Sequence, residues 1–157
     1  MVIGFDPGFA ITGWGVLEKE GHLIAVRGFG TLETPAQEAM PVRLARLFQD
    51  VEALIKEFRP RRCVVERLFF SRNQKTAAGV YQARGVILAA IGLADLPLLE
   101  LTPQQVKQTL TGSGRASKTD VMRMVERLLG VRPDRDDAAD ALACALAGLS
   151  DMIWRVS

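Results

Sequence analysis

The order of short apolar runs and longer helical patterns limits the fold of this chain more than any other feature. Runs at 2–6, 13–19 and 22–32 have the length and residue types of β-strands, and the first ends in an Asp-Pro-Gly turn signal at 6–8. A Glu-Gly pair at 20–21 is a hairpin-turn signal between the second and third runs. The first three strands are therefore predicted to form a meander.

Helical and extended patterns then alternate along the chain. Apolar side chains recur at three- and four-residue spacing from about 37 to 58, which predicts a helix, and 62–66 is a fourth strand. A second helix is predicted over 74–94 and a fifth strand over 98–101. Crossover helices would place the fourth and fifth strands beside the first. We expect an α/β fold with one five-stranded mixed sheet flanked by helices.

Three more helices are predicted after the fifth strand, the last of them from about 136 to 149. The other two begin with a hydroxyl residue followed three positions later by a capping-box partner. These pairs are Thr102 with Gln105, and Ser117 with Asp120. Gly130 is expected to end the second of these helices.

The predicted helix over 74–94 is apolar on nearly every face between 86 and 93. A helix that is apolar all round is buried all round. In a small domain, this pattern predicts either a central helix or a subunit interface, and the sequence leaves both open.

Composition places the chain among soluble globular proteins. A length of 157 residues corresponds to one domain, 1–157, and the apolar fraction of 48% is ordinary. Cys63 and Cys144 lie in apolar runs and are predicted to be reduced core residues. A single histidine, His22, excludes a multi-histidine metal site.

No membrane span or signal peptide is predicted. The longest apolar stretch, 85–99, contains Asp95 and Pro97 and is too short and interrupted to cross a bilayer. The N-terminus runs directly into a strand pattern. Cytoplasm is the expected location.

Charge alternates along the chain although the net charge is only +2. Segments 59–84 and 101–133 carry net charges of +6 and +4, whereas 1–58 and 134–157 each carry −3. A positive rim around a negative centre suits a metal-dependent nuclease. The alternative is that these runs are solvated faces.

Four carboxylates occupy positions where carboxylates are scarce. Asp6 and Glu66 each close an apolar strand, and Asp137 and Asp140 interrupt an apolar helix. Half-buried charges of one sign repel one another unless a cation compensates them. Oxygen ligands on a rigid scaffold suit Mg²⁺ or Mn²⁺, and two such ions could share these groups for phosphoester hydrolysis.

Helical spacing supports the pairing of Asp137 with Asp140, because residues three apart share one face. Asp136 and Asp140 are also spaced for one face, so Asp136 stays an alternative ligand. Capping is the competing role for the acidic residues at the helix start, but it does not explain Asp140, a full turn inside.

A glycine- and serine-rich loop at 111–117 leads into the helix N-terminus at Lys118. Its backbone amides, with Arg115 and Lys118, suit a phosphate, and Lys107 lies on the preceding helix. The loop lacks the spacing of a nucleotide-binding P-loop, and a plain connector is the alternative.

Two aromatic residues, Phe69 and Phe70, follow Glu66 among the basic residues Arg72 and Lys75. Adjacent residues in an extended segment face opposite sides, so one can be core while the other is exposed. An exposed ring among cations could stack on an unpaired base. The alternative is that both rings are packed.

A set of motifs spans almost the whole chain in order. The motifs are Gly4-Phe5-Asp6-Pro7-Gly8 with Thr12-Gly13-Trp14-Gly15, Val65-Glu66-Arg67, Gln82-Ala83-Arg84-Gly85, Thr102 to Lys118, and Asp137-Ala138-Ala139-Asp140-Ala141-Leu142-Ala143. Together they resemble the RuvC-type Holliday-junction resolvases of bacteria, which have the ribonuclease H-like fold.

The resemblance implies a homodimer that acts in DNA recombination and repair. Its two active sites would nick symmetry-related strands of a four-way DNA junction and leave 5′-phosphate and 3′-hydroxyl ends. A branch-migration complex of the RuvA and RuvB type is the implied protein partner.

The resemblance also implies roles for individual residues. Metal-binding positions carry over onto the four carboxylates, and the lysines near the scissile phosphate carry over onto Lys107 and Lys118. The aromatic residue that opens bases at the crossover carries over onto Phe69, with Phe70 as the neighbouring candidate.

Other functions compete with this one. The spacing of Asp6, Gly8 and Gly13 also resembles the first phosphate motif of sugar-kinase and actin-like ATPases, which need two such domains around the nucleotide. A non-catalytic junction-binding module would be expected to lack a carboxylate. A ribonuclease H-like enzyme that cuts RNA–DNA hybrids would share the metals and differ in substrate geometry.

Overall fold

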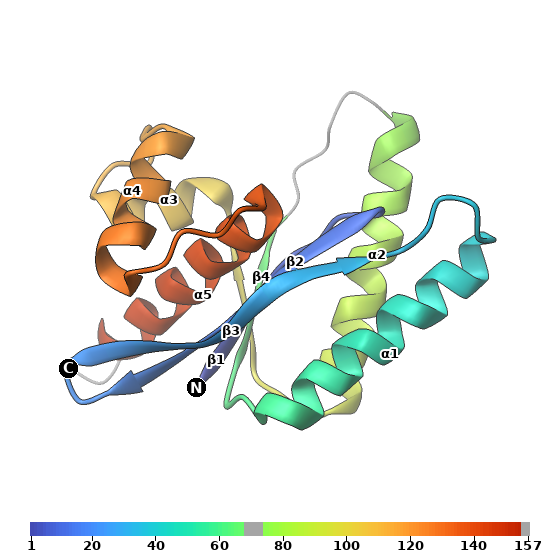
Figure 1. Ribbon diagram of the computed structural model, residues 1–157, viewed down its shortest axis with the longest axis horizontal. Coiled ribbons are helices and arrows are strands. Elements are labelled where there is room, and N and C mark those ends of the chain that lie inside the picture. Colours follow the sequence, from blue (N-terminus) through green and yellow to red (C-terminus); the bar gives the residue numbers. More distant parts are fainter. Residues whose placement is uncertain (68–73, 155–157) are drawn as a thin grey trace.

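The computed structural model describes residues 1–67 and 74–154, with side chains described in 1–67 and 77–150. The described part contains a five-stranded sheet and five helices (Figure 1). The elements are β1 (Val2–Asp6), β2 (Ile11–Glu20), β3 (Leu23–Glu33), α1 (Met40–Phe58), β4 (Cys63–Glu66), α2 (Gln74–Leu93), β5 (Leu98–Leu101), α3 (Pro103–Thr111), α4 (Lys118–Leu129) and α5 (Asp136–Trp154).

The sheet is mixed, as predicted, with strand order β3-β2-β1-β4-β5. The first three strands form the expected antiparallel meander, and β4 pairs with β1 in parallel. The prediction was wrong in one respect, because β5 pairs with β4 and not with β1. Both edges of β1 are already paired, by β2 and by β4, so the second crossover extends the sheet outward.

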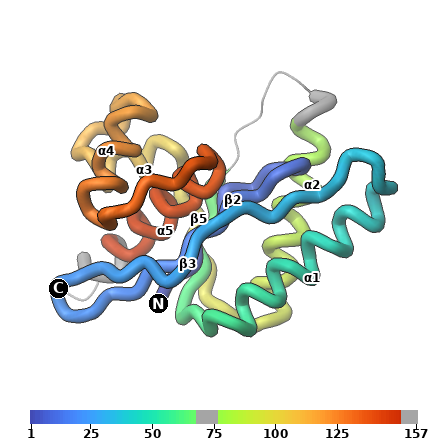
Figure 2. Tube along the Cα trace, viewed as in Figure 1, coloured from blue at the N-terminus to red at the C-terminus, as the bar shows by residue number. Residues whose placement is uncertain are grey.

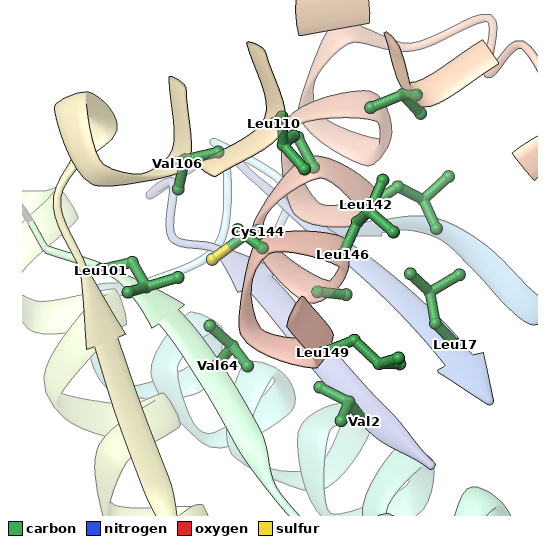
Figure 3. Close-up of a cluster of buried hydrophobic side chains, with 14 of the residues drawn as sticks. Val2, Leu17, Val64, Leu101, Val106, Leu110, Leu142, Cys144, Leu146 and Leu149 are labelled. Atoms are coloured by element: carbon green, nitrogen blue, oxygen red, sulfur yellow. The ribbon is translucent and has the colours of Figure 1, made fainter. Parts of the chain in front are cut away.

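Helices cover both faces of the sheet. Helices α1 and α2 lie on one face, whereas α3, α4 and α5 lie on the other (Figures 1 and 2). Side chains alternate between the two faces along β1, so the hydrophobic core has two parts. Ile3 and Phe5 pack with α1 and α2, whereas Val2 packs on the α5 side. Figure 3 shows Leu142 and Leu146 of α5 among the side chains of that second cluster.

Helix boundaries follow local signals. Both predicted capping boxes form. The Thr102 and Ser117 side chains accept hydrogen bonds from the backbone N–H groups of Gln105 and Asp120, whose side chains accept in return from the N–H groups of Thr102 and Ser117. Helix α1 begins at Met40 and not near 37, because Pro41 lacks an N–H and fits the first turn of a helix. Helix α5 continues past 149 to Trp154.

Helix α2 is buried on one face only, so the expectation of a helix buried all round within the chain was wrong. Ile87 and Ile91 are at most 2% exposed, whereas Leu93 is 78% exposed. Its exposed face also includes Ala89 and Gly92. The alternative, a subunit interface, stays a prediction. No helix in the described part of the chain is long and apolar enough to cross a membrane.

Helix α5 rests directly on the sheet because glycines of β1 and β2 lie beneath it. A methyl group at Gly13 would lie 1.9 Å from the carbonyl oxygen of Asp137, and one at Gly4 would lie 2.5 Å from that of Ala141. Side chains there would hold the helix away from the strands. Glycine at these positions therefore brings the first turns of α5 against the end of β1.

Candidate active site

Asp6 and Glu66 end neighbouring parallel strands at the same edge of the sheet, as predicted. The register pairs Phe5 with Val65, so the two carboxylates follow side by side. Both lie on the α5 face, because residues alternate along a strand and Gly4 and Val64 contact α5. The strand ends thus direct both groups toward the start of α5.

Four carboxylates interact at this edge. Burial, together with the charges of Glu66, Asp140 and Asp137, raises the pKa of Asp6 from its ordinary value of 3.8 to about 7. The Lys118 ammonium acts in the opposite direction. The fold therefore brings carboxylates from β1, β4 and α5 close together in a partly buried position.

The pKa values of Glu66 and Asp140 are raised for similar reasons. Burial and then the charge of Asp140 raise the pKa of Glu66 from 4.5 to about 7, against the opposing charges of Lys118 and Lys107. Burial also raises the pKa of Asp140, against its hydrogen bond to Lys118. Raised pKa values of this kind indicate that the carboxylates need a nearby cation to be ionised together.

Two lysines face these carboxylates across a cleft of about 220 Å³. Lys107 of α3 and Lys118 of α4 line it together with Glu66 and Asp140. Lys118 Nζ donates to Asp140 Oδ2 at 3.0 Å and lies 3.2 Å from Asp136 Oδ2. Although partial burial disfavours the ammonium, these carboxylates raise the pKa of Lys118 above its usual value, so Lys118 is a cation and not a base at neutral pH.

The donor set fits a divalent cation by its chemistry. Carboxylate oxygens are the ligands that Mg²⁺ and Mn²⁺ prefer. Burial first, and then the neighbouring carboxylates, raise the pKa values of Asp6 and Glu66, and a bound cation would offset both effects. As the described side chains lie, no group of three or more acidic, histidine or cysteine side chains is arranged to hold a metal ion. Asp140 accepts a hydrogen bond from Lys118, so the Asp140 side chain must rotate before it can bind the same metal ion as the other carboxylates.

Other predicted site residues lie elsewhere. Arg115 is exposed and lines a separate groove between α3 and α4, with Arg123 and Arg127. Asp136 has an 83% exposed side chain, and the aspartates whose charges act on Asp6 are Asp137 and Asp140.

The predicted DNA contacts after β4 are not placed by the structure. Phe69, Phe70 and Arg72 lie outside the described residues, as does the side chain of Lys75. Their roles stay predictions.

A buried arginine beside the site was missed. Arg43 of α1 is 6% exposed and donates a hydrogen bond to the Phe9 carbonyl in the loop that follows Asp6. Its position was readable in principle, because Arg43 is spaced at helical intervals with the buried residues Leu47, Val51 and Leu54. A cation within an apolar stripe is a signal for a buried polar network.

Comparison with known proteins decides the family. The family model described as Crossover junction endodeoxyribonuclease RuvC matches residues 2–148. The chain belongs to the RuvC family. RuvC proteins are metal-dependent nucleases, so membership makes this chain an endodeoxyribonuclease and agrees with a carboxylate site at the sheet edge.

Individual RuvC proteins match over most of their length. The RuvC protein of Desulfitobacterium hafniense (strain DSM 10664 / DCB-2) is 47% identical over 148 residues, which cover 93% of this chain and 90% of the relative. The structure of Thermus thermophilus RuvC in complex with Holliday junction substrate matches with a TM-score of 0.92 and 34% identity, covering 98% of this chain and 95% of that one.

A more distant structure supports the fold alone. The yeast mitochondrial Holliday junction resolvase Ydc2 matches with a TM-score of 0.70 at 14% identity, covering 95% of this chain and 78% of that one. The predicted ribonuclease H-like fold is confirmed by these structural neighbours.

Proposed function

We propose that this protein resolves four-way DNA junctions by metal-dependent hydrolysis of one phosphodiester in each of two symmetry-related strands. The observation that carries the proposal is the RuvC family match over 2–148, combined with four interacting carboxylates at the sheet edge. The products would be nicks with 5′-phosphate and 3′-hydroxyl ends, the ends that a ligase joins.

Asp6, Glu66, Asp137 and Asp140 would hold the metal, as Mg²⁺ or Mn²⁺ and with two ions in each active site. The ions, when bound, would activate a water and stabilise the leaving oxygen in an in-line displacement at phosphorus. Asp6 and Glu66 project from rigid strand ends, which keeps the ligand positions fixed relative to the scissile phosphate.

The two lysines of the cleft would act on the phosphate. Lys118 is an ammonium at neutral pH, so its role would be to stabilise negative charge developing on the phosphoryl oxygens. Lys107 faces Glu66 across the same cleft and would hold the neighbouring phosphate oxygen. Arg115 would contact DNA from the α3–α4 groove, away from the cut.

Paired nicking requires two active sites, which we propose are supplied by a homodimer. Supporting this proposal, α2 exposes Ala89, Gly92 and Leu93. A two-fold axis through that face would pair the same surface with itself. We propose further that 1–157 act as a single nuclease domain, which works beside a branch-migration complex of the RuvA and RuvB type.

The decisive experiment incubates the protein with a synthetic four-way DNA junction in Mg²⁺ or Mn²⁺. Linear duplex of the same sequence and an RNA–DNA hybrid are incubated in parallel. We expect paired symmetrical nicks in the junction alone. Cutting of the hybrid alone would assign the protein to the ribonuclease class, and junction binding without cutting in either metal would favour a non-catalytic module.

Replacing Lys118 with methionine is expected to reduce junction cutting about 10²-fold. The Lys118 charge lowers the pKa values of Asp6, Glu66 and Asp140, so its loss raises them and moves the acid limb of the pH–rate profile to higher pH. Rates are measured from pH 6 to 9 under single-turnover conditions.

Lys107→Met is the matched control for Lys118→Met. Lys107 lowers the pKa of Glu66, whereas Lys118 acts on Asp6, Glu66 and Asp140. The acid limb of Lys107→Met should therefore move less. An unchanged acid limb in Lys118→Met would contradict the electrostatic role assigned to this lysine.

A further inference from the structure

The loop that follows Asp6 is held by buried polar side chains. Within the described side chains, the buried polar or charged residues are Thr12, Thr34 and Arg43, each at most 6% exposed. All three bind this loop, since Thr12 Oγ1 donates to the Gly8 carbonyl at 2.9 Å and the other two bind the Phe9 carbonyl. The buried polar side chains described in this chain are therefore concentrated on the loop that follows Asp6.

Arg43 forms the centre of this network. Its Nη2 donates to the Phe9 carbonyl at 3.2 Å, and to the carbonyl and hydroxyl oxygens of Thr34 at 3.2 and 3.1 Å. Thr34 Oγ1 in turn donates to the Phe9 carbonyl at 2.7 Å. The guanidinium carbon also lies 3.6 Å from the centre of the Phe9 ring.

The Phe9 side chain is enclosed from the other direction by α2. A methyl group at Gly79 would lie 2.7 Å from Phe9 Cγ, so the ring packs directly against the α2 backbone. The Asp6 loop is thus anchored between α1 and α2, on the face of the sheet opposite to α5. Asp137 and Asp140 are positioned from α5, so the two parts of the site have separate supports.

We propose that Arg43, through Thr34 and Phe9, is a positioning residue that fixes the Asp6 carboxylate for metal binding. The charges that act on Asp6 come from Glu66, Asp140, Asp137 and Lys118. Arg43 therefore acts through the loop and not through its own charge. Its Nε and Nη2 atoms donate to these oxygens from a fixed planar arrangement, which the freely rotating ammonium of lysine does not reproduce.

The inference rests on the proposed metal-dependent function, so its test includes metal binding as well as cutting. Five variants are compared: Arg43→Met, Arg43→Lys, Thr34→Val, the double variant of Arg43→Met with Thr34→Val, and the control Arg46→Met. Arg46 lies on the same helix, is 47% exposed, and pairs with Glu38 at the surface. For each variant, the Mn²⁺ concentration that gives half of the maximal rise in melting temperature is measured, together with the junction-cutting rate.

We expect Arg43→Met to raise the half-saturating Mn²⁺ concentration about tenfold, and to reduce cutting at limiting Mn²⁺ by at least tenfold with partial recovery at high Mn²⁺. Arg43→Lys should fall between wild type and Arg43→Met, and Thr34→Val should change both quantities in the same direction. Arg46→Met should match wild type. In a double-mutant cycle, the Arg43 and Thr34 effects should be less than additive.

A lower melting temperature with an unchanged Mn²⁺ half-saturation in Arg43→Met would overturn the proposal and make Arg43 a structural residue only. If Arg43→Met does not fold, Thr34→Val decides, because valine keeps the shape of threonine while removing the hydroxyl; an unchanged half-saturation there would also overturn it. Absence of cutting by wild type would reject the proposed function, and the Mn²⁺ comparison would still test Arg43.

Discussion

Replacing Asp6 with asparagine is expected to abolish junction cutting while making the metal-free protein more stable at pH 8. Cutting should fall about 10³-fold or more, because Asp6 is the proposed metal ligand at the centre of the carboxylate group. Stability should rise because asparagine removes a partly buried charge that Glu66, Asp140 and Asp137 all repel.

The pH dependence of this gain has a definite sign. The pKa of Asp6 is about 7 in the folded protein and near 3.8 in the unfolded chain, so the folded state binds the proton more tightly. As pH rises from about 4 to about 7, wild type loses stability, and the penalty is complete above pH 7. At about 1.4 kcal/mol per pKa unit, and allowing for coupling to Glu66, the Asp6→Asn gain at pH 8 should be about 2 kcal/mol.

Urea unfolding without divalent metal, measured from pH 4 to 8.5, tests this prediction. The difference between Asp6→Asn and wild type should vanish near pH 4 and be greatest above pH 7. Added Mg²⁺ or Mn²⁺ should stabilise wild type more than the variant. Asp134→Asn, at an exposed aspartate, is the matched control and should follow wild type throughout. A variant less stable than wild type at pH 8 would contradict the assigned repulsion.

Gly13→Ala is expected to cause a large structural effect, because the added methyl group would make the shortest contact of any glycine position in this chain. The new carbon would lie 1.9 Å from the Asp137 carbonyl oxygen and 2.3 Å from its carbonyl carbon. Both atoms are backbone, so α5 must move away from β2. We expect a loss of about 3 kcal/mol in the free energy of unfolding, and about 10²-fold slower cutting because the aspartates of α5 move with the helix.

Gly28→Ala provides the matched control in the same sheet. Its methyl group would meet side-chain atoms of Phe58 and Trp14 at 3.0 Å or more, and these can shift. Urea unfolding and the cutting rate should therefore change much less than in Gly13→Ala. Equal effects of the two substitutions would show that close approach of α5 is not what makes glycine necessary at 13.

Features encoded within a few residues were predictable from the sequence. The strands, the capping boxes at Thr102 and Ser117 and the ends of β1 and β4 all depend on local residue types and periodicity. Asp6 and Glu66 were readable for the same reason, because each is a carboxylate at the end of an apolar strand. Parallel pairing then required them to share one edge.

The remaining features depend on contacts between distant segments, and only the tertiary structure decided them. These include β5 pairing with β4, the salt bridge between Lys118 and Asp140, and the exposed face of α2. Arg43 shows why: its partners, Phe9 and Thr34, are 34 and 9 residues away in the chain. The sequence by itself indicated the carboxylates and lysines of the candidate site, but not Arg43. Packing of α1, α2 and α5 on the sheet determined where these side chains lie. The burial and electrostatic repulsion of each side chain depend on all of its neighbours in space, which come from distant parts of the chain.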